Sequence, residues 1–245
     1  MGSKVQDRIW LLRIALVSAI VGLAVYIHGR LDSTVIRRFA NLSYGHTESL
    51  WGSQWLGIPT AQNPNDAWII QEIISEVVPD YIIEAGTAKG GSAVLWATIL
   101  RHVNPDGKVI TIDIEDTSAE AKKLDISQRM ITFMLGSSTD PKIVAEISKH
   151  VKGKKTLVIL DSDHHKEHVL NEMKSYAPFV NIGGYLIVQD SNINGHPVHP
   201  TFGPGPMEAI EAFLASNRDF QPDAGREHFL YLTNPRGYLK RIKSQ

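Results

Sequence analysis

Residues 81–92 read YIIEAGTAKGGS, a short apolar run that leads into a glycine-rich turn. The run predicts a buried strand over 81–84, and the periodicity of 90–102 predicts a helix directly after the turn. Glycines allow a sharp bend and let a ligand approach the backbone, and the free N–H groups at the start of the helix attract polar ligand groups. The stretch therefore predicts a strand, turn and helix that together bind a ligand.

Apolar strands and helices alternate along the rest of the chain. Further strands are predicted at 108–114, 130–135, 156–160 and 184–188, and further helices at 66–78, 141–151, 166–176 and 207–216. Segments 229–232 and 238–242 are predicted to close the sheet as an antiparallel pair. This order predicts an α/β fold with a mostly parallel sheet, helices on both faces and an antiparallel C-terminal strand, and in such folds ligands bind at the carboxyl ends of the strands.

Three features near the first two strands favour a cofactor that carries a nucleoside. The glycine pattern Gly86-x-Ala88-x-x-Gly91 is compatible with a degenerate dinucleotide loop, although a plain structural turn has the same residues. Asp113 ends the second strand, where an acid accepts hydrogen bonds from ribose hydroxyls. Glu84 precedes the loop, and an acid there favours S-adenosylmethionine over a dinucleotide. Ser137, in the turn after the third strand, either lines an adenine pocket or belongs to an ordinary turn.

Oxygen-bearing side chains follow the fourth and fifth strands. Asp161 and Asp163 come after the fourth, and Gln189 and Asp190 come after the fifth. Because neighbouring parallel strands end at one rim, these groups suit Mg²⁺, which prefers hard oxygen ligands. The alternative is that the acids cap the helices that follow them. Zinc is disfavoured, because the nearby histidines lack an H-E-x-x-H context.

The composition excludes several classes of protein. The chain has 245 residues, 43% of them hydrophobic, and a net charge of −1 from 25 basic and 26 acidic residues. A disordered chain, a polytopic membrane protein and a general nucleic-acid binder are all excluded by these values. The absence of cysteine excludes disulfides, thiolate metal sites and a cysteine nucleophile.

The N-terminal 40 residues differ from the rest. Residues 9–27 read IWLLRIALVSAIVGLAVYI, a run of 19 residues in which Arg13 is the one charge. A membrane span needs roughly 20 such residues, so a membrane anchor is predicted, with an oligomerisation helix or a cleaved signal peptide as alternatives. Basic residues flank both ends and give no orientation. Residues 31–60, with Trp51 and Trp55, are expected to be a loop-rich lead-in.

Nine stretches between Tyr44 and Arg241 together resemble the cephalosporin hydroxylase/rhamnosyl O-methyltransferase family. They are LWGSQWLG, DAWIIQEII, IIEAGTAKGGSA, ITIDI, LGSSTDP, VILDSDHHKEHVL, YLIVQDSNINGHPV, FGPGPMEAI and NPRGYLKR. The resemblance implies a Rossmann-like class I methyltransferase that uses S-adenosylmethionine and Mg²⁺. The residues predicted to bind the cofactor are Glu84, Gly86, Thr87, Gly90, Gly91, Ser92, Asp113 and Ser137.

The resemblance also implies a metal triad and a base. The triad falls on Asp163, Gln189 and Asp190, with Asp161 as the neighbouring candidate. Gln189 departs from the glutamate that the family usually has, and it offers a carbonyl oxygen without charge, which weakens the case for a metal-dependent step. Catechol-type O-methyltransferases have a similar Asp-His-x-Lys sequence, so the implied general base is Lys166 first and His164 second.

These observations predict an N-terminal segment 1–40 and a methyltransferase-like domain 41–245. The expected reaction is O-methylation of a hydroxyl on a sugar, glycolipid or small metabolite. The alternatives are a non-catalytic, membrane-tethered cofactor-binding module and an NAD(P)-dependent oxidoreductase. We expect a homo-oligomer, no nucleic-acid partner and membrane contact through residues 9–27. The catalytic domain is expected in the cytoplasm, on a single anchor, or as a wholly cytoplasmic protein.

Overall fold

Seven strands form one sheet in the order β5-β4-β3-β6-β7-β9-β8. The computed structural model describes residues 2–46 and 52–243, and the side chains from Trp10 onward. The sheet strands are β3 (Tyr81–Ala85), β4 (Lys108–Asp113), β5 (Ile131–Leu135), β6 (Thr156–Leu160), β7 (Tyr185–Val188), β8 (Phe220–Pro222) and β9 (Tyr238–Arg241). The first five are parallel, and β9 runs antiparallel to both of its neighbours. The predicted α/β fold is confirmed.

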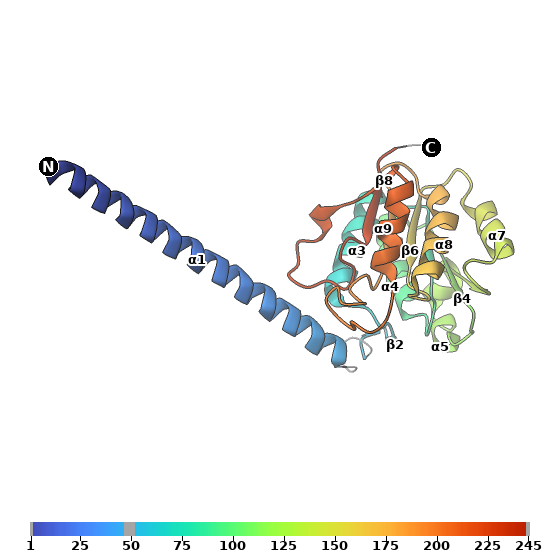
Figure 1. Cartoon of the computed structure of the whole chain (residues 1–245). Helices are drawn as coiled ribbons and strands as arrows, with labels where there is room; N and C mark the ends of the chain where they lie inside the picture. The colour runs from blue at the N-terminus through green and yellow to red at the C-terminus, as the bar shows by residue number, and fades with distance from the viewer. Residues whose placement is uncertain (1, 47–51, 244–245) are drawn as a thin grey trace.

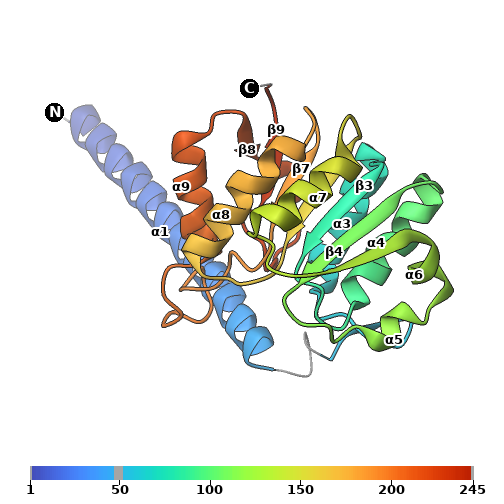
Figure 2. The ribbon, with the colours of Figure 1, turned by 90° about the vertical axis from the view of Figure 1, so that its right-hand side faces the viewer.

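Helices cover both faces of this sheet (Figures 1 and 2). They are α3 (Pro64–Val77), α4 (Gly91–Val103), α5 (Ala119–Lys122), α6 (Asp125–Met130), α7 (Pro141–Val151), α8 (Lys166–Tyr176) and α9 (Pro206–Ser216), with 3-10 turns η1 (Ala177–Phe179) and η2 (Ala224–Arg226). Alternate strand residues pack on opposite faces: Ile82 lies in the core under α3 and α4, and Ile83 in the core under α7, α8 and α9. This two-sided burial explains why the parallel strands are almost entirely apolar.

The strand order changes direction at β3: β4 and β5 lie on one side of it, and β6 lies on the other. The chain builds β3, β4 and β5 outward, then returns to place β6 beside the other edge of β3. Ligands bind in the crevice at such a switch point. The turns after β3 and β6 therefore form the two sides of one opening.

Two local predictions are wrong. Residues 31–45 are not a loop, because helix α1 (Gly2–Gly45) runs through them, while Trp51 lies outside the described residues. Segment 229–232 forms no strand, and β8 takes the edge position next to β9 instead. The backbone oxygen of Tyr231 accepts a bond from Asn65 Nδ2, and its ring packs edge-on against Phe39 of α1, so tertiary contacts with two helices replace strand pairing here. A small hairpin of β1 (Gln54–Trp55) and β2 (Ile58–Pro59) follows the undescribed residues 47–51.

Helix α1 touches the domain only near its C-terminal end, and the rest projects away (Figure 1). Ala40 is fully buried in a small cluster with Ile193, Val198 and Tyr231, and Tyr44 packs against the same cluster. Among the described residues, 10–45 form a helix long and apolar enough to cross a membrane, and its most apolar window is not buried at all inside the protein.

An acidic side chain lies inside the core next to the glycine turn. Glu84 is fully buried and accepts hydrogen bonds from Trp96 Nε1 (2.9 Å) and Thr111 Oγ1 (2.7 Å). Thr111 Oγ1 lies 2.7 Å from Thr87 Oγ1 in the turn. Burial raises the pKa of the Glu84 carboxyl from 4.5 to about 7, even though these bonds favour its ionised form.

The substitution Glu84→Gln is expected to remove a pH-dependent loss of stability. A buried acid with a raised folded-state pKa destabilises the fold progressively as pH rises from its unfolded to its folded pKa, here from about 4.5 to about 7. The free energy of unfolding of the wild type should fall across this window, by on the order of 3 kcal/mol from this one group. Gln fits the site, since its amide can donate to Thr111 and the Thr111 hydroxyl can then donate to Thr87.

Urea unfolding of both proteins at several pH values between 4.5 and 7 measures this difference. The exposed substitution Glu115→Gln is the matched control and should keep the wild-type slope. Identical slopes for the wild type and Glu84→Gln would contradict the prediction.

Candidate active site

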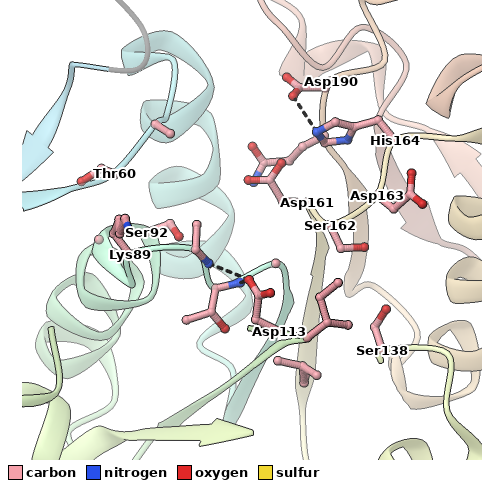
Figure 3. Close-up of a pocket in the computed structure, with 18 of the residues that line it drawn as sticks. Thr60, Lys89, Ser92, Asp113, Ser138, Asp161, Ser162, Asp163, His164 and Asp190 are labelled. Carbon is pink, nitrogen blue, oxygen red and sulfur yellow. Dashed lines mark hydrogen bonds and ion pairs between the residues drawn. The ribbon is translucent and has the colours of Figure 1, made fainter. Parts of the chain in front are cut away.

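A cavity of about 970 Å³ opens at the carboxyl ends of the parallel strands. The turns after five strands contribute to its walls, together with residues from several other segments. The lining residues from the turns are Gly86–Ala88, Asp113, Ile114, Gly136–Ser138, Asp161–His164, Gln189 and Asp190, and those from elsewhere include Tyr44 of α1, Thr60 after β2 and His168 of α8. The predicted location of the site at the strand ends therefore coincides with a real cavity (Figure 3).

The glycine turn lies against the end of β6. A Cβ atom on Gly86 would be 2.0 Å from the backbone oxygen of Asp161, and its φ of +99° also favours glycine. A Cβ on Gly91 would be 2.2 Å from the backbone oxygen of Pro59 in the hairpin. These two glycines let three segments meet at one side of the cavity.

Asp113 holds the turn in place. Its Oδ2 accepts hydrogen bonds from the backbone N–H groups of Thr87 (3.0 Å) and Ala88 (2.8 Å), and its Oδ1 accepts from Glu115 N–H (3.1 Å). The side chain still lines the cavity (Figure 3). Next to it, Ile114 is 72% exposed although it is apolar, and it also lines the cavity, so it presents an apolar surface to whatever binds beside Asp113.

The predicted cofactor residues divide into two groups. Gly86, Thr87, Gly91, Ser92, Asp113 and Ser137 line the cavity, whereas Glu84 and Gly90 do not. Glu84 lies beneath the turn, where its bond to Thr111 supports Thr87 from inside the core. Its position fits a role in orienting the loop rather than contact with a ligand.

At the other end of the cavity three side chains converge. Asp161, His164 and Asp190 each bring one ligand atom to within 4.8 Å of the others. His164 Nε2 lies 3.2 Å from Asp190 Oδ2, and Gln62 Nε2 donates to Asp161 Oδ2 at 3.0 Å. The structure thus brings together the ends of β6 and β7, as the sequence predicts, and adds a histidine nitrogen to the carboxylates.

These two carboxyls disfavour each other's ionised form. Burial, followed by the charge of Asp190, raises the pKa of Asp161 well above its usual value. Burial also raises the pKa of Asp190, and the nearby His164 opposes that shift. A divalent cation between the two would relieve both effects.

The other residues predicted to bind the metal or act as the base are not part of this three-residue cluster. Asp163 Oδ1 accepts from the backbone N–H of His165 (2.9 Å) and lies 2.6 Å from its Nδ1, outside the cluster (Figure 3). Gln189 is 4% exposed and lines the cavity, and its Nε2 has no hydrogen-bond partner among the described residues. Lys166 starts α8 and is not among the residues that line the cavity.

A buried network holds Asp190 in position. Asp190 has a left-handed backbone (φ +54°), and its N–H donates to Asn234 Oδ1 at 2.9 Å. The buried Asp66 accepts from the backbone N–H groups of Thr233 and Asn234 and from the hydroxyl of Tyr238. Burial raises the pKa of Asp66 to about 6. This network fixes a strained residue at the cavity wall.

Ile114 and Tyr44 are among the lining side chains that the sequence did not predict. Ile114 had a usable signal, because it is an apolar residue at a strand end, directly after the acid that the sequence predicts to bind a ribose. Tyr44 had none, since it belongs to a segment that was interpreted as a loop. Its ring stacks on His199 at 5.8 Å, and burial, with the charge of Asp190, raises the pKa of its hydroxyl.

Comparison with known proteins supports this description. The family model for Rhamnosyl O-methyltransferase/CmcI matches residues 48–242. A rhamnosyl O-methyltransferase of Mycobacterium tuberculosis is 40% identical over 95% of this chain and 98% of its own length, and one of Mycobacterium leprae is 41% identical over 76% and 82%.

Solved structures share the fold. An apo structure of CmcI has a TM-score of 0.58 at 22% identity, over 79% of this chain and 78% of the other, and a CmcI structure described with Mg and SAM has the same values. The O-methyltransferase TomG from Streptomyces achromogenes has a TM-score of 0.51 at 16% identity, over 74% and 81%. Together with the match over most of its length, these findings confirm the predicted family: the chain belongs to the rhamnosyl O-methyltransferase/CmcI family and is an O-methyltransferase.

Proposed function

We propose that the protein transfers a methyl group from S-adenosylmethionine to a hydroxyl of a rhamnosyl group, with a divalent cation such as Mg²⁺ bound at the site. One observation carries the proposal. A single cavity joins the glycine turn and Asp113 at one end to Asp161, His164 and Asp190 at the other. The acceptor class rests on the relatives that share 40% identity over nearly the whole chain and are named rhamnosyl O-methyltransferases.

The cofactor half of the cavity suits a nucleoside. Asp113 would accept hydrogen bonds from the ribose hydroxyls. Beyond it, Ile114 would pack on a purine whose other side faces the turn from Gly136 to Ser138. When bound, S-adenosylmethionine supplies an electrophilic methyl group on a sulfonium. The residues of the turn would direct that group toward the acidic end.

The acidic half fits a hard divalent cation. Asp161 and Asp190 offer carboxylate oxygens, and Gln189 offers a carbonyl oxygen at the same rim. The raised pKa values of both aspartates mean that a positive charge placed between them would be favoured. When bound, Mg²⁺ lowers the pKa of a coordinated hydroxyl.

His164 is our candidate for the general base. Its Nε2 lies 3.2 Å from Asp190 Oδ2 (Figure 3), and this contact orients the ring. The other ring nitrogen, Nδ1, would take the proton from the acceptor hydroxyl as the hydroxyl oxygen attacks the methyl carbon and the carbon–sulfur bond breaks. Lys166, the first candidate from the sequence, is the weaker one, because its side chain is not part of the cavity wall.

Residues 9–27 would anchor the protein in a membrane, with the catalytic domain in the cytoplasm. These 19 residues make a helix of about 28 Å, close to the thickness of the hydrocarbon core, roughly 30 Å. The helix continues to Gly45 and reaches the cavity through Tyr44. A homo-oligomer stays a prediction.

Asp113→Asn is expected to weaken binding of S-adenosylhomocysteine at least tenfold. One amide oxygen cannot replace two carboxylate oxygens that accept three backbone bonds and a ribose hydroxyl. Isothermal calorimetry measures the affinity, with exposed Asp106→Asn as the control that should keep it. NAD⁺ in the same titrations tests the alternative oxidoreductase function: tight NAD⁺ binding and no response to S-adenosylhomocysteine would reject the proposal.

Asp161→Asn is expected to weaken Mn²⁺ binding at least tenfold, whereas Asp163→Asn should not. Only the first carboxylate belongs to the cluster with Asp190, so the pair is a matched test of the metal ligand. Electron paramagnetic resonance of Mn²⁺ titrations reads binding directly, without turnover. Equal losses in both variants, or a loss in Asp163→Asn alone, would contradict the assignment.

His164→Gln is expected to lower kcat with methyl α-L-rhamnopyranoside as acceptor by roughly 10²- to 10⁴-fold, the usual contribution of a general base. The affinity for S-adenosylhomocysteine should stay at the wild-type value, because the residue is at the far end of the cavity. Lys166→Gln is the control and should retain most of the activity. No turnover by the wild type on any rhamnoside, with cofactor binding intact, would favour a non-catalytic binding module.

Charges placed in the apolar run are expected to release the protein from membranes. Val17→Arg combined with Val21→Arg puts two cations near the middle of the span, at several kcal/mol of cost. Val35→Arg, on the same exposed helix outside the run, is the control. Flotation of full-length protein with liposomes reads the outcome, and equal flotation of all three proteins would reject the anchor.

A further inference from the structure

A buried acid lies behind the part of the cavity assigned to the purine. Glu172 of α8 is fully buried and is not itself a lining residue. Its Oε1 accepts hydrogen bonds from the hydroxyls of Ser138 (2.5 Å) and Ser162 (2.6 Å). Both serines line the cavity, and Figure 3 shows Ser162 next to the acidic end and Ser138 farther from it, across from Asp113. The mechanism described above gives Glu172 no role.

The direction of these hydrogen bonds decides what the serines can offer a ligand. A hydroxyl has one proton and two acceptor lone pairs, and a carboxylate only accepts. Because each hydroxyl proton is directed at Glu172, the lone pairs of Ser138 and Ser162 are what remains for the cavity. The two side chains therefore present acceptors, and a ligand must supply the donors.

His168 reinforces this arrangement. Its Nε2 lies 3.3 Å from Glu172 Oε1 and 3.2 Å from Ser138 Oγ. The hydrogen bond to Glu172 raises the pKa of His168, and an Nε2–H directed at Oε1 is a third donor to the same carboxylate. With three donors on Oε1, neither serine proton is released to a ligand without the loss of a charge-assisted bond.

We propose that Glu172 sets the purine specificity of the site by fixing Ser138 and Ser162 as acceptors for the exocyclic amino group of adenine. A 6-oxo purine would bring a carbonyl oxygen against these acceptors. Buried polar groups that are left unpaired reject such an analogue far more strongly than a shape mismatch does. The inference rests on the proposed use of S-adenosylmethionine, and Glu172 acts as a positioning residue that does not touch the ligand.

The test compares two nucleosides that differ at one position of the base. Calorimetry of the full-length protein in detergent gives the affinities for S-adenosylhomocysteine and for its deaminated analogue, S-inosylhomocysteine. The wild type should prefer the adenine compound at least tenfold. Glu172→Gln should lower this preference at least fivefold, because its amide can donate to a serine oxygen and free that hydroxyl proton for a carbonyl.

Matched variants separate this role from general damage to the fold. Glu167→Gln, exposed on the same helix, should keep the wild-type preference. Ser138→Ala combined with Ser162→Ala removes both acceptors and should also lower the preference, and it carries the test if Glu172→Gln does not fold. An unchanged preference in either folded variant, or equal wild-type affinities for the two compounds, would overturn the inference. A wild type that binds neither nucleoside would instead overturn the proposed function.

Discussion

The close approach of the β3 turn to the end of β6 is the constraint on which the site depends. The N–H of Asp161 donates to the backbone oxygen of Ala85 at 2.8 Å, and the next residue, Gly86, has no room for a side chain against Asp161. This contact exists because β6 returns to the far side of β3. It places the glycine turn and the Asp161 carboxylate in the wall of one cavity.

Three buried carboxylates beneath the cavity wall hold groups of that wall in position. Glu84 supports the glycine turn through Thr111, Asp66 fixes the segment that holds Asp190, and Glu172 orients two serine hydroxyls. Each is fully buried and each is bonded to groups that donate. Ionising such groups away from water costs free energy. The hydrogen bonds that these carboxylates accept offset part of that cost, and they hold the donor groups in fixed directions at the cavity wall.

The sequence predicted the sheet well because the spacing of apolar residues and the turn residues that bound each run are local features. The strand 156–160 and the helices 141–151 and 166–176 have the predicted bounds, since apolar runs between turn residues have few alternatives. The site was harder. Asp161 and Asp163 are two residues apart, and only the direction of each side chain in the turn after β6 shows that the first faces Asp190. Segment 229–232 has strand-like residues, yet contacts with α1 and α3 decide its shape.

Helix α1 connects the apolar run at residues 9–27 directly to the cavity at Tyr44. Its apolar run lies about 25 Å from Tyr44 along the helix axis, at 1.5 Å for each of 17 residues. Tyr44 lines the cavity, and its neighbour Ala40 is locked into a cluster with the segment before β9. A continuous helix transmits orientation better than a flexible linker does. A membrane bound by residues 9–27 would therefore fix both the distance and the direction from which an acceptor reaches His164 and Asp190.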